Sequence, residues 1–179
     1  LVDAAGKLSK NKRGALIVVD LGSDLRPEDF LYSGTNIEAQ LSTDLLINLF
    51  ATDTPLHDGA VLVKGNKIIS AGVILPLSRQ GISRYGTRHL AALGITERFD
   101  RCICIVVSEE TGTLSLANQG KLERPITSSR LQELLENLIG NQNVMGNSKS
   151  SLSKNALSQK TNPSDDIISN INSIQKFQF

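Results

Sequence analysis

Hydrophobic positions follow two different spacings along the first 139 residues of the chain. Two continuous apolar runs of strand length, Ala15–Asp20 and Cys102–Val107, are rich in β-branched residues and predict buried strands. Apolar residues three and four positions apart predict one helix that begins at Leu1 and another over Thr87–Arg98. The other expected elements are a short strand at Ile37–Leu41, a helix capped by Ser42, a hairpin of Ala60–Lys64 and Ile68–Leu75, a strand at Thr113–Ala117 and a helix from Thr127 or Ser128 to Gly140. Because strands and helices are interspersed but the hairpin is antiparallel, the pattern predicts an α/β (α+β) fold with a mixed central β-sheet flanked by helices.

The composition changes at Gly140. Of the last 40 residues, 19 are Ser, Asn or Gln. We therefore expect residues 1–139 to form one folded domain. Residues 140–162 are expected to form a flexible polar linker, because such a stretch buries too little apolar surface to fold. Residues 163–179 begin with a typical helix start and carry isoleucines at helical spacing. Two interpretations stay open for this tail: a disordered end, or an amphipathic helix that docks on the domain or on a partner.

Composition and charge exclude three classes of protein. The net charge of +1 creates no overall field for nucleic acid. No apolar run approaches the ~20 residues that a bilayer-spanning helix needs. Two cysteines cannot build the disulfide framework of a small secreted domain. Cys102 and Cys104 alternate along one expected strand, which predicts two buried free thiols in a reducing compartment.

Three segments gather most of the reactive side chains. His57 and Asp58 precede an expected strand, Gly86-Thr-Arg-His89 begins an expected helix, and Ser108-Glu-Glu110 follows another strand. Each has a plain structural interpretation when taken alone: a turn, a helix cap and a solvated hairpin end. Together they favour a binding site, because the helix start offers amides, a hydroxyl and a cation to phosphate groups.

The carboxylates near these segments indicate a divalent metal. Asp58 with Glu109 or Glu110, and with His57 close by, has the donor types that hold a divalent metal between phosphate oxygens. The chain has no Gly-rich Walker sequence. Carboxylates beside a phosphate cradle of another kind indicate nucleotide chemistry outside the Walker class.

Four ordered motifs carry a resemblance to a known family. They are Leu45-Leu-Ile-Asn-Leu-Phe50, Thr54-Pro-Leu-His-Asp-Gly-Ala60, Gly86-Thr-Arg-His89 followed by Ala91-Ala92 and Gly94-Ile95, and Val107-Ser-Glu-Glu-Thr-Gly112. With these motifs the chain resembles the diadenylate cyclase (DAC) domain family, in particular its membrane-anchored CdaA-type class, from about Val2 to Ile139. The resemblance implies the fold of that family and the condensation of two ATP molecules into cyclic di-AMP and two pyrophosphates, at a face-to-face homodimer interface.

The resemblance also implies cofactors, partners and location. A divalent metal (Mn²⁺, Mg²⁺ or Co²⁺) is expected at the site, a regulatory protein is a candidate partner, and no nucleic acid is involved. The helical spacing that starts at Leu1, with no Met before it, indicates a helix cut in its first turn and thus a longer native protein. We expect that protein to be a cytoplasmic domain tethered to the inner face of the membrane by a segment absent from this chain, in the CdaA-type arrangement of three hydrophobic helices ahead of the domain.

The family's functional residues carry over onto the matching motifs. Asp58 would help to deprotonate the ribose 3′-hydroxyl, with Thr87 and Arg88 as the other catalytic residues. Glu109 and Glu110 match the acidic pair that binds metal, and His57 is a further metal-ligand candidate. The expected nucleotide-binding residues are Gly59, Ala60, Leu75, Gly86, Thr87, Arg88, His89, Ser108 and Glu109.

Two positions depart from the family pattern. Leu90 stands where the family commonly has Arg, on a helix residue that either faces the phosphates or supports the fold, and Arg84 is a candidate to compensate. Ile74 stands where an aromatic residue often stacks near adenine. A catalytically silent nucleotide-binding regulatory module of the same fold is therefore the alternative function. A structural interaction domain without a nucleotide site is a third hypothesis, which the motif set disfavours.

Overall fold

The computed structural model describes residues 1–52, 54–80 and 85–140. Expectations for residues 141–179, the linker and tail, lie outside the described residues, as does Arg84. Residues Leu1–Ile139 make up one unit by their internal contacts. Its helices are α1 (Val2–Lys10), α2 (Thr43–Leu49), α3 (Thr87–Arg98) and a helix over residues 128–140, with short 3-10 turns η1 (Pro27–Asp29) and η2 (Pro55–His57). Its strands are β1 (Ala15–Asp20), β2 (Thr35–Gln40), β3 (Ala60–Lys64), β4 (Lys67–Val73), β5 (Cys102–Val107), β6 (Leu114–Asn118) and β7 (Lys121–Ile126).

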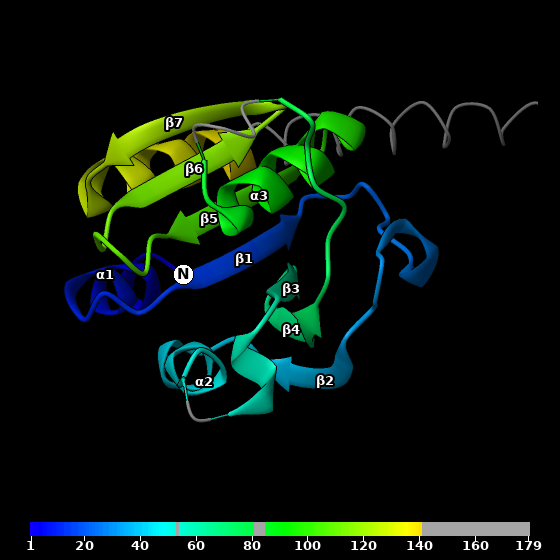
Figure 1. Ribbon diagram of the computed structural model, residues 1–179, viewed down its shortest axis with the longest axis horizontal. Coiled ribbons are helices and arrows are strands. Elements are labelled where there is room, and N and C mark those ends of the chain that lie inside the picture. Colours follow the sequence, from blue (N-terminus) through cyan, green and yellow to red (C-terminus); the bar gives the residue numbers. More distant parts are fainter. Residues whose placement is uncertain (53, 81–84, 141–179) are drawn as a thin grey trace, which may run out of the picture. The chain divides into compact units, whose positions relative to one another are not determined.

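The strands form one mixed sheet in the order β2-β4-β3-β1-β5-β6-β7 (Figure 1). β1 runs parallel to β3, with Ile17 opposite Val61, and antiparallel to β5, with Ala15 opposite Val107. The pairings of β2 with β4, β3 with β4, β5 with β6 and β6 with β7 are antiparallel. The expected fold, a mixed central sheet flanked by helices, is confirmed.

Local signals explain where several helices start. The Ser42 hydroxyl accepts a hydrogen bond from the Leu45 amide at 3.1 Å, which caps α2 as expected. The Thr127 hydroxyl accepts from the Arg130 amide at 3.1 Å, so Thr127 and not Ser128 caps the helix over residues 128–140. α3 is different, because its N-cap residue Gly86 has no side chain with which to cap the helix.

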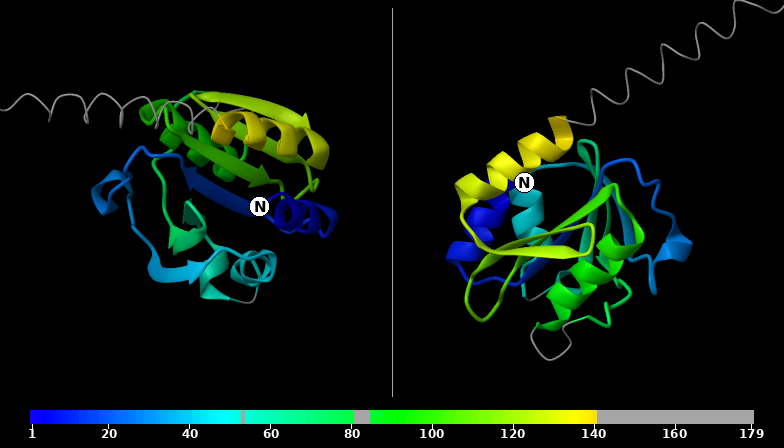
Figure 2. Two further views of the ribbon diagram at one scale, coloured as in Figure 1. Left: turned by 180° about the vertical axis from the view of Figure 1, so that it is seen from behind. Right: turned by 90° about the horizontal axis from the view of Figure 1, so that it is seen from above.

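Helices lie on both faces of the sheet (Figure 2). α1, α2 and the helix over 128–140 pack on one face, around a cluster that includes Leu8, Ile17, Phe50 and Leu131. α3 packs on the opposite face, against a cluster that includes Cys102 and Cys104. The two cysteines share one face of β5, and both are buried and free, as expected.

The expected and observed strands differ at the edges of the sheet. β7 was not expected, since only Leu122 and Ile126 of its six residues are even partly shielded from solvent, and the strand contains Pro125. β4 ends at Val73, two residues before the expected end at Leu75, and Ile74 makes an isolated bridge to Tyr32 instead. The apolar alternation that predicted the other edge strand, β2, is missing from β7, so the hydrophobic pattern does not reveal β7.

Within residues 1–52, 54–80 and 85–140, no helix combines the length and the apolar character that crossing a membrane requires.

Candidate active site

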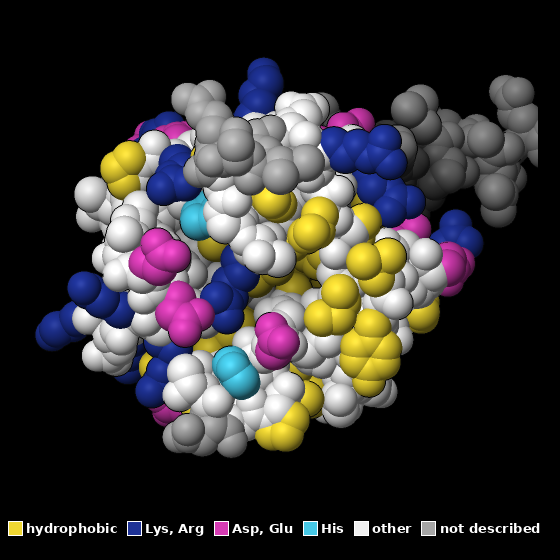
Figure 3. Space-filling model, in the orientation of Figure 1, with side chains coloured by type: hydrophobic (Ala, Val, Ile, Leu, Met, Phe, Trp, Pro, Cys, Tyr) yellow, Lys and Arg dark blue, Asp and Glu magenta, His cyan; other side chains and the backbone are white. Residues whose placement is uncertain are grey.

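An open cavity of about 810 Å³ lies on the α3 side of the sheet, where several chain segments end together. This volume falls in the range of pockets that take small-molecule ligands. Figure 3 shows the hollow with apolar side chains on one side and charged side chains on the other. The lining residues are Leu16, Asp58, Gly59, Val73, Ile74, Leu75, Leu77, Gly86, Thr87, Arg88, His89, Ala91, Val107, Ser108, Glu109, Glu110, Thr111 and Arg124.

The DGA segment reaches the cavity from the end of η2. Asp58 is exposed there, between η2 and β3, and it lines the cavity together with Gly59. Gly59 has a φ of +110°, and a Cβ atom at this position would lie 2.7 Å from the carbonyl carbon of Gly72. The close approach of the β4 backbone therefore requires a glycine at residue 59. This packing places Asp58 just before the start of β3.

The start of α3 presents uncapped backbone amides to the cavity. Gly86, Thr87 and Arg88 all line it. The N-cap makes no side-chain hydrogen bond, so the first N–H groups of this 12-residue helix remain available to an anion. The Thr87 hydroxyl and the Arg88 guanidinium add a donor and a positive charge to the same place.

Arg88 is held by an acidic residue of a different segment. Its Nη1 atom donates to Oε2 of Glu109 at 2.8 Å. The Arg88 side chain is 29% exposed and that of Glu109 is 58% exposed, so solvent screens the pair. The pair adds little to stability, but it orients the guanidinium in the cavity.

The turn after β5 carries the remaining acidic residues. The Ser108 hydroxyl accepts from the Thr111 amide at 3.3 Å, and the Gly112 amide donates to the Ser108 carbonyl at 2.9 Å. The Ser9 hydroxyl of α1 in turn donates to the Gly112 carbonyl. This anchoring to α1 places Ser108, Glu109 and Glu110 along one wall of the cavity.

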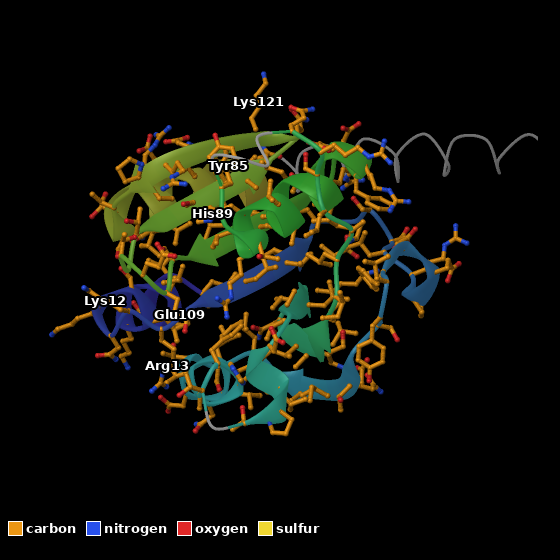
Figure 4. The ribbon with its side chains drawn as sticks, in the orientation of Figure 1. Lys12, Arg13, Tyr85, His89, Glu109 and Lys121 are labelled. Carbon is orange, nitrogen blue, oxygen red and sulfur yellow. The ribbon has the colours of Figure 1, made fainter. Side chains whose placement is uncertain are left out.

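A second wall combines a neutral histidine with a cation. His89 is buried, and its Nε2 atom lies 3.2 Å from the Ser115 hydroxyl. Burial, and to a smaller extent the charge of Arg124, lowers the pKa of His89, so the ring is neutral at pH 7. The Arg124 guanidinium lies 5.6 Å from the centroid of the Tyr85 ring, within cation–π range. Figure 4 shows Tyr85 and His89 close together beside α3.

The opposite end of the cavity is apolar. Val73, Ile74, Leu75 and Leu77 line it. The Ile74 amide donates to the Tyr32 carbonyl at 2.9 Å, and its own carbonyl accepts from Leu31 at 2.9 Å. Both backbone groups of Ile74 are already hydrogen-bonded. A ring that enters this end of the cavity would therefore contact the Ile74 side chain and the residues around Leu75.

Ten of the sequence-predicted site residues line this one cavity: Asp58, Gly59, Leu75, Gly86, Thr87, Arg88, His89, Ser108, Glu109 and Glu110. His57 and Ala60 do not. Ala60 is fully buried in β3. His57 lies outside the lining, with Nδ1 hydrogen-bonded to the Thr54 carbonyl, which leaves Nε2 for any other partner.

Leu90 also lies away from the cavity. Its side chain is 7% exposed, and its carbonyl accepts a hydrogen bond from the Ser78 amide at 2.9 Å. Of the two alternatives for this position, the structure shows the supporting one. Leu90 is therefore not part of the charged wall of the cavity.

The donor set for a metal is incomplete within a single chain. Across residues 1–52, 54–80 and 85–140, no three His, Cys, Asp or Glu side chains come close enough together to bind one ion. Three carboxylates, Asp58, Glu109 and Glu110, nevertheless line the cavity. Such a set fits a hard cation that takes one or two carboxylates and completes its coordination with ligand phosphates.

Sequence reasoning did not identify Arg124, which lines the cavity, or Gly14, which lies beside it. Arg124 lines the cavity from β7, a strand that the hydrophobic pattern does not predict. Gly14 lies directly behind the ion pair of Arg88 with Glu109, where an added Cβ atom would be 2.7 Å from Nη1 of Arg88. No local motif marks either position, since both depend on contacts between distant segments.

The chain is similar to known proteins over most of its first 139 residues. The family model described as "DAC: DisA bacterial checkpoint controller nucleotide-binding" matches residues 2–122. The chain is 42% identical to cyclic di-AMP synthase CdaA of Bacillus subtilis (strain 168) over 138 residues, which are 76% of this chain and 50% of that protein. It is 47% identical to a diadenylate cyclase of Listeria monocytogenes serotype 1/2a (strain 10403S) over 130 residues, 72% of this chain and 46% of that protein. The chain thus spans about half the length of these curated relatives.

Solved structures show the same likeness. A double mutant of DacA from Staphylococcus aureus superposes with a TM-score of 0.70 at 38% identity, covering 77% of this chain and 91% of that one. A protein from Bacillus cereus, described as a hypothetical membrane spanning protein, superposes with a TM-score of 0.64 at 44% identity, covering 70% of this chain and 61% of that one.

Proposed function

This chain belongs to the DAC family, the DisA bacterial checkpoint controller nucleotide-binding domains, and we propose that it is a diadenylate cyclase. The reaction joins two ATP molecules into cyclic di-AMP and releases two pyrophosphates. The observation that carries the proposal is the single cavity that combines an apolar end, an uncapped helix start with Arg88, and the carboxylate of Asp58. The names of the relatives, cyclic di-AMP synthase and diadenylate cyclase, support it.

ATP binds along the cavity with its two ends in different environments. The adenine lies at the apolar end beside Ile74 and Leu75. The phosphates lie at the start of α3, where the free amides, the Thr87 hydroxyl and the Arg88 guanidinium donate to phosphate oxygens. Arg124 adds a second guanidinium on the β7 side of the same wall.

Asp58 acts on the ribose. Its carboxylate accepts the proton of the 3′-hydroxyl, and the 3′-oxygen attacks the α-phosphorus of the ATP held by the facing subunit. A new P–O bond forms, the bond from the α-phosphorus to the bridging oxygen breaks, and pyrophosphate leaves. The 3′-oxygen of the second nucleotide then attacks the α-phosphorus of the first in the same way, which releases the second pyrophosphate and closes the ring. Positioning and charge neutralisation supply most of the acceleration, because no covalent enzyme intermediate is needed.

A divalent metal, Mn²⁺, Mg²⁺ or Co²⁺, fits the carboxylates that face the phosphates. Asp58, Glu109 and Glu110 are the residues in the cavity that would hold it, with His57 as a further ligand through Nε2. When bound, the metal would neutralise phosphate charge and lower the pKa of the attacking hydroxyl. Three carboxylates beside a triphosphate would otherwise repel it.

A second copy of this chain completes the reaction, since one cavity holds one ATP. The surface beside the apolar end of the cavity supports this arrangement. Leu31, Tyr32, Ile74 and Leu77 are exposed large apolar residues, with Leu31 71% exposed. Ile74 and Leu77 also line the cavity, and Ile74 is bridged to Tyr32. A contiguous apolar patch at the mouth of a site fits an interface between two copies.

We place the domain on the cytoplasmic side of the membrane, tethered by a segment outside this chain and open to a regulatory protein. The likeness to CdaA and to a protein described as membrane spanning supports the tether. The full-length native sequence tests it: hydrophobic helices ahead of Leu1 are expected, and a native protein with no hydrophobic segment would contradict it.

The decisive experiment is direct. The protein is incubated with ATP and either Mn²⁺ or Mg²⁺, and the products are identified by mass. We expect one cyclic di-AMP and two pyrophosphates for every two ATP consumed. ATP binding without product under each metal and at high protein concentration would leave the silent nucleotide-binding module as the function.

The dimer has its own test. Specific activity should rise with protein concentration in the dilute range, because two subunits must meet for each turnover. Analytical ultracentrifugation over the same range gives the monomer fraction. Constant specific activity at concentrations where the chain is monomeric would contradict face-to-face catalysis.

A further inference from the structure

Gly14 lies where three segments of the site meet. It is buried immediately before β1, behind the ion pair that joins Arg88 of α3 to Glu109 of the turn after β5. A Cβ atom at residue 14 would lie 2.7 Å from Nη1 of Arg88, 2.8 Å from its Cζ and 3.0 Å from Cβ of Glu109. All three distances are well inside the ~3.5–4.0 Å of van der Waals contact. The pair therefore occupies space that any other amino acid would fill.

The backbone does not explain this glycine. Gly59 and Gly112 have positive φ values, of 110° and 75°, which L-residues rarely adopt. Gly14 is not among the positive-φ residues of the described chain. An alanine could adopt its backbone conformation, so only the missing side chain distinguishes the position.

A side chain at residue 14 would act on Arg88 more than on the fold. The guanidinium is the mobile end of a long side chain, so it can move away from an added methyl group. The pair that it would leave is half exposed and contributes little to stability. Moving the guanidinium, however, changes where the positive charge stands in the cavity.

We infer that Gly14 is a positioning residue for nucleotide binding: its lack of a side chain lets the Arg88 guanidinium stand against Glu109, facing the phosphates. This inference rests on the proposed function for the identity of the ligand. It assigns to the start of β1 a part in the site that the motifs around Asp58, Arg88 and Glu109 do not include.

The test is Gly14→Ala, compared with Gly6→Ala as a matched control. The Kd and KM for ATP should rise about tenfold in Gly14→Ala, the effect of weakening a charge-assisted hydrogen bond. The Tm should stay within about 4 °C of the unmodified protein, the shift of a minor change in stability. Gly6 lies on α1, where a Cβ atom would meet only the Ser128 hydroxyl, at 3.2 Å, so Gly6→Ala should leave Kd and KM unchanged. Equal ATP affinity in Gly14→Ala and the unmodified protein would overturn the inference.

A double variant shows whether the effect runs through Arg88. In an Arg88→Ala background the two nearest clashing atoms, Nη1 and Cζ of Arg88, are gone and only the 3.0 Å approach to Cβ of Glu109 remains. Adding Gly14→Ala there should therefore change the Kd of ATP by less than about twofold. A loss as large as in the presence of Arg88 would overturn the inference. If Gly14→Ala alone does not fold, recovery of folding in the double variant supports the clash with Arg88, and failure to recover overturns it.

A crystal structure of Gly14→Ala separates this inference from the proposed function. We expect Nη1 of Arg88 to lie beyond hydrogen-bond distance of Glu109, a readout that needs no ATP. An unmoved guanidinium overturns the positioning role even if the protein is a cyclase. Failure of the unmodified protein to make cyclic di-AMP, with the guanidinium displaced in the variant, would overturn the cyclase proposal alone.

Discussion

The two faces of the sheet are covered differently. On one face, α1, α2 and the helix over 128–140 enclose a cluster rich in large side chains, such as Leu8, Ile17, Leu46 and Phe50. On the other face the cluster contains many small residues: Ala60, Ala91, Ala92, Cys102, Cys104 and Ala117. Small residues let α3 lie close to the strands.

The first face therefore contributes mainly to stability, and the second face carries the cavity. The large side chains of the first face bury much apolar area, and of the buried residues in that cluster Val107 alone lines the cavity. The second face leaves the start of α3 open, so its amides and charged side chains point into the cavity. We therefore expect variants of the first face to change unfolding without changing ATP affinity, and variants of the cavity to do the reverse.

The largest effect expected on the cavity side is that of Asp58→Asn. Removing the base should lower turnover by about 10³–10⁴-fold, at the strong end of general-base contributions. Asp58 is exposed, so the Tm and the Kd for ATP should change little. Initial rates of cyclic di-AMP formation and calorimetric ATP binding measure the two quantities. Asp44→Asn, an exposed aspartate on α2, is the matched control and should be fully active; unchanged turnover in Asp58→Asn would remove Asp58 from the mechanism.

On the helix-covered face, Phe50→Ala should have the largest effect on stability. Phe50 is 1% exposed, and truncating it should lower the free energy of unfolding by about 3–5 kcal/mol. Urea unfolding measures this loss. The ATP affinity of the folded variant should be unchanged, and a weakened affinity would show that the two faces are coupled. Ile139→Ala, at an exposed position of a helix on the same face, should cost much less.

The hydrophobic pattern predicts the centre of the sheet and one edge strand, β2, but misses the other edge strand, β7. β1, β3, β5 and α3 have the expected bounds, because continuous burial imposes a continuous apolar run or a helical period. β7 is not continuously buried, because it is the last strand of the sheet in the described chain and one of its edges faces solvent. Its polar sequence resembles a loop.

The site shows the same division. The motifs around Asp58, Thr87 and Glu109 can be recognised in the sequence, because each combines a functional side chain with a turn or a helix start. Arg124 and Gly14 have no local signature. Their parts follow from register and packing, which bring β7 beside α3 and the start of β1 behind Arg88. Tertiary contacts of this kind cannot be derived from one sequence.

Arg124→Ala tests the contribution of the second cavity wall to ATP binding. Loss of this guanidinium should raise the Kd and KM for ATP by about tenfold, the effect of one charge-assisted contact to phosphate, and should leave kcat nearly unchanged. Added salt should reduce the difference from the unmodified protein. Lys121→Ala is the control, because Lys121 lies on the same strand outside the cavity lining (Figure 4). Equal losses in both variants would indicate a general charge effect, and no loss in Arg124→Ala would exclude a phosphate contact.

The smallest expected effect is a pH dependence of stability that comes from His89. Burial first, and Arg124 second, lowers the pKa of this imidazole in the folded protein, so the unfolded chain binds its proton more readily. The contribution of neutral His89 is therefore complete above the unfolded pKa and is lost as the pH falls toward the folded pKa. The Tm should decrease as the pH is lowered from about 7 to about 5, the range in which an unperturbed histidine titrates. His89→Gln keeps a polar group near Ser115 and does not titrate, so its Tm should change less over this range. An identical decrease in both proteins would assign the pH dependence to other groups and leave the α3 face without a titrating residue in its core.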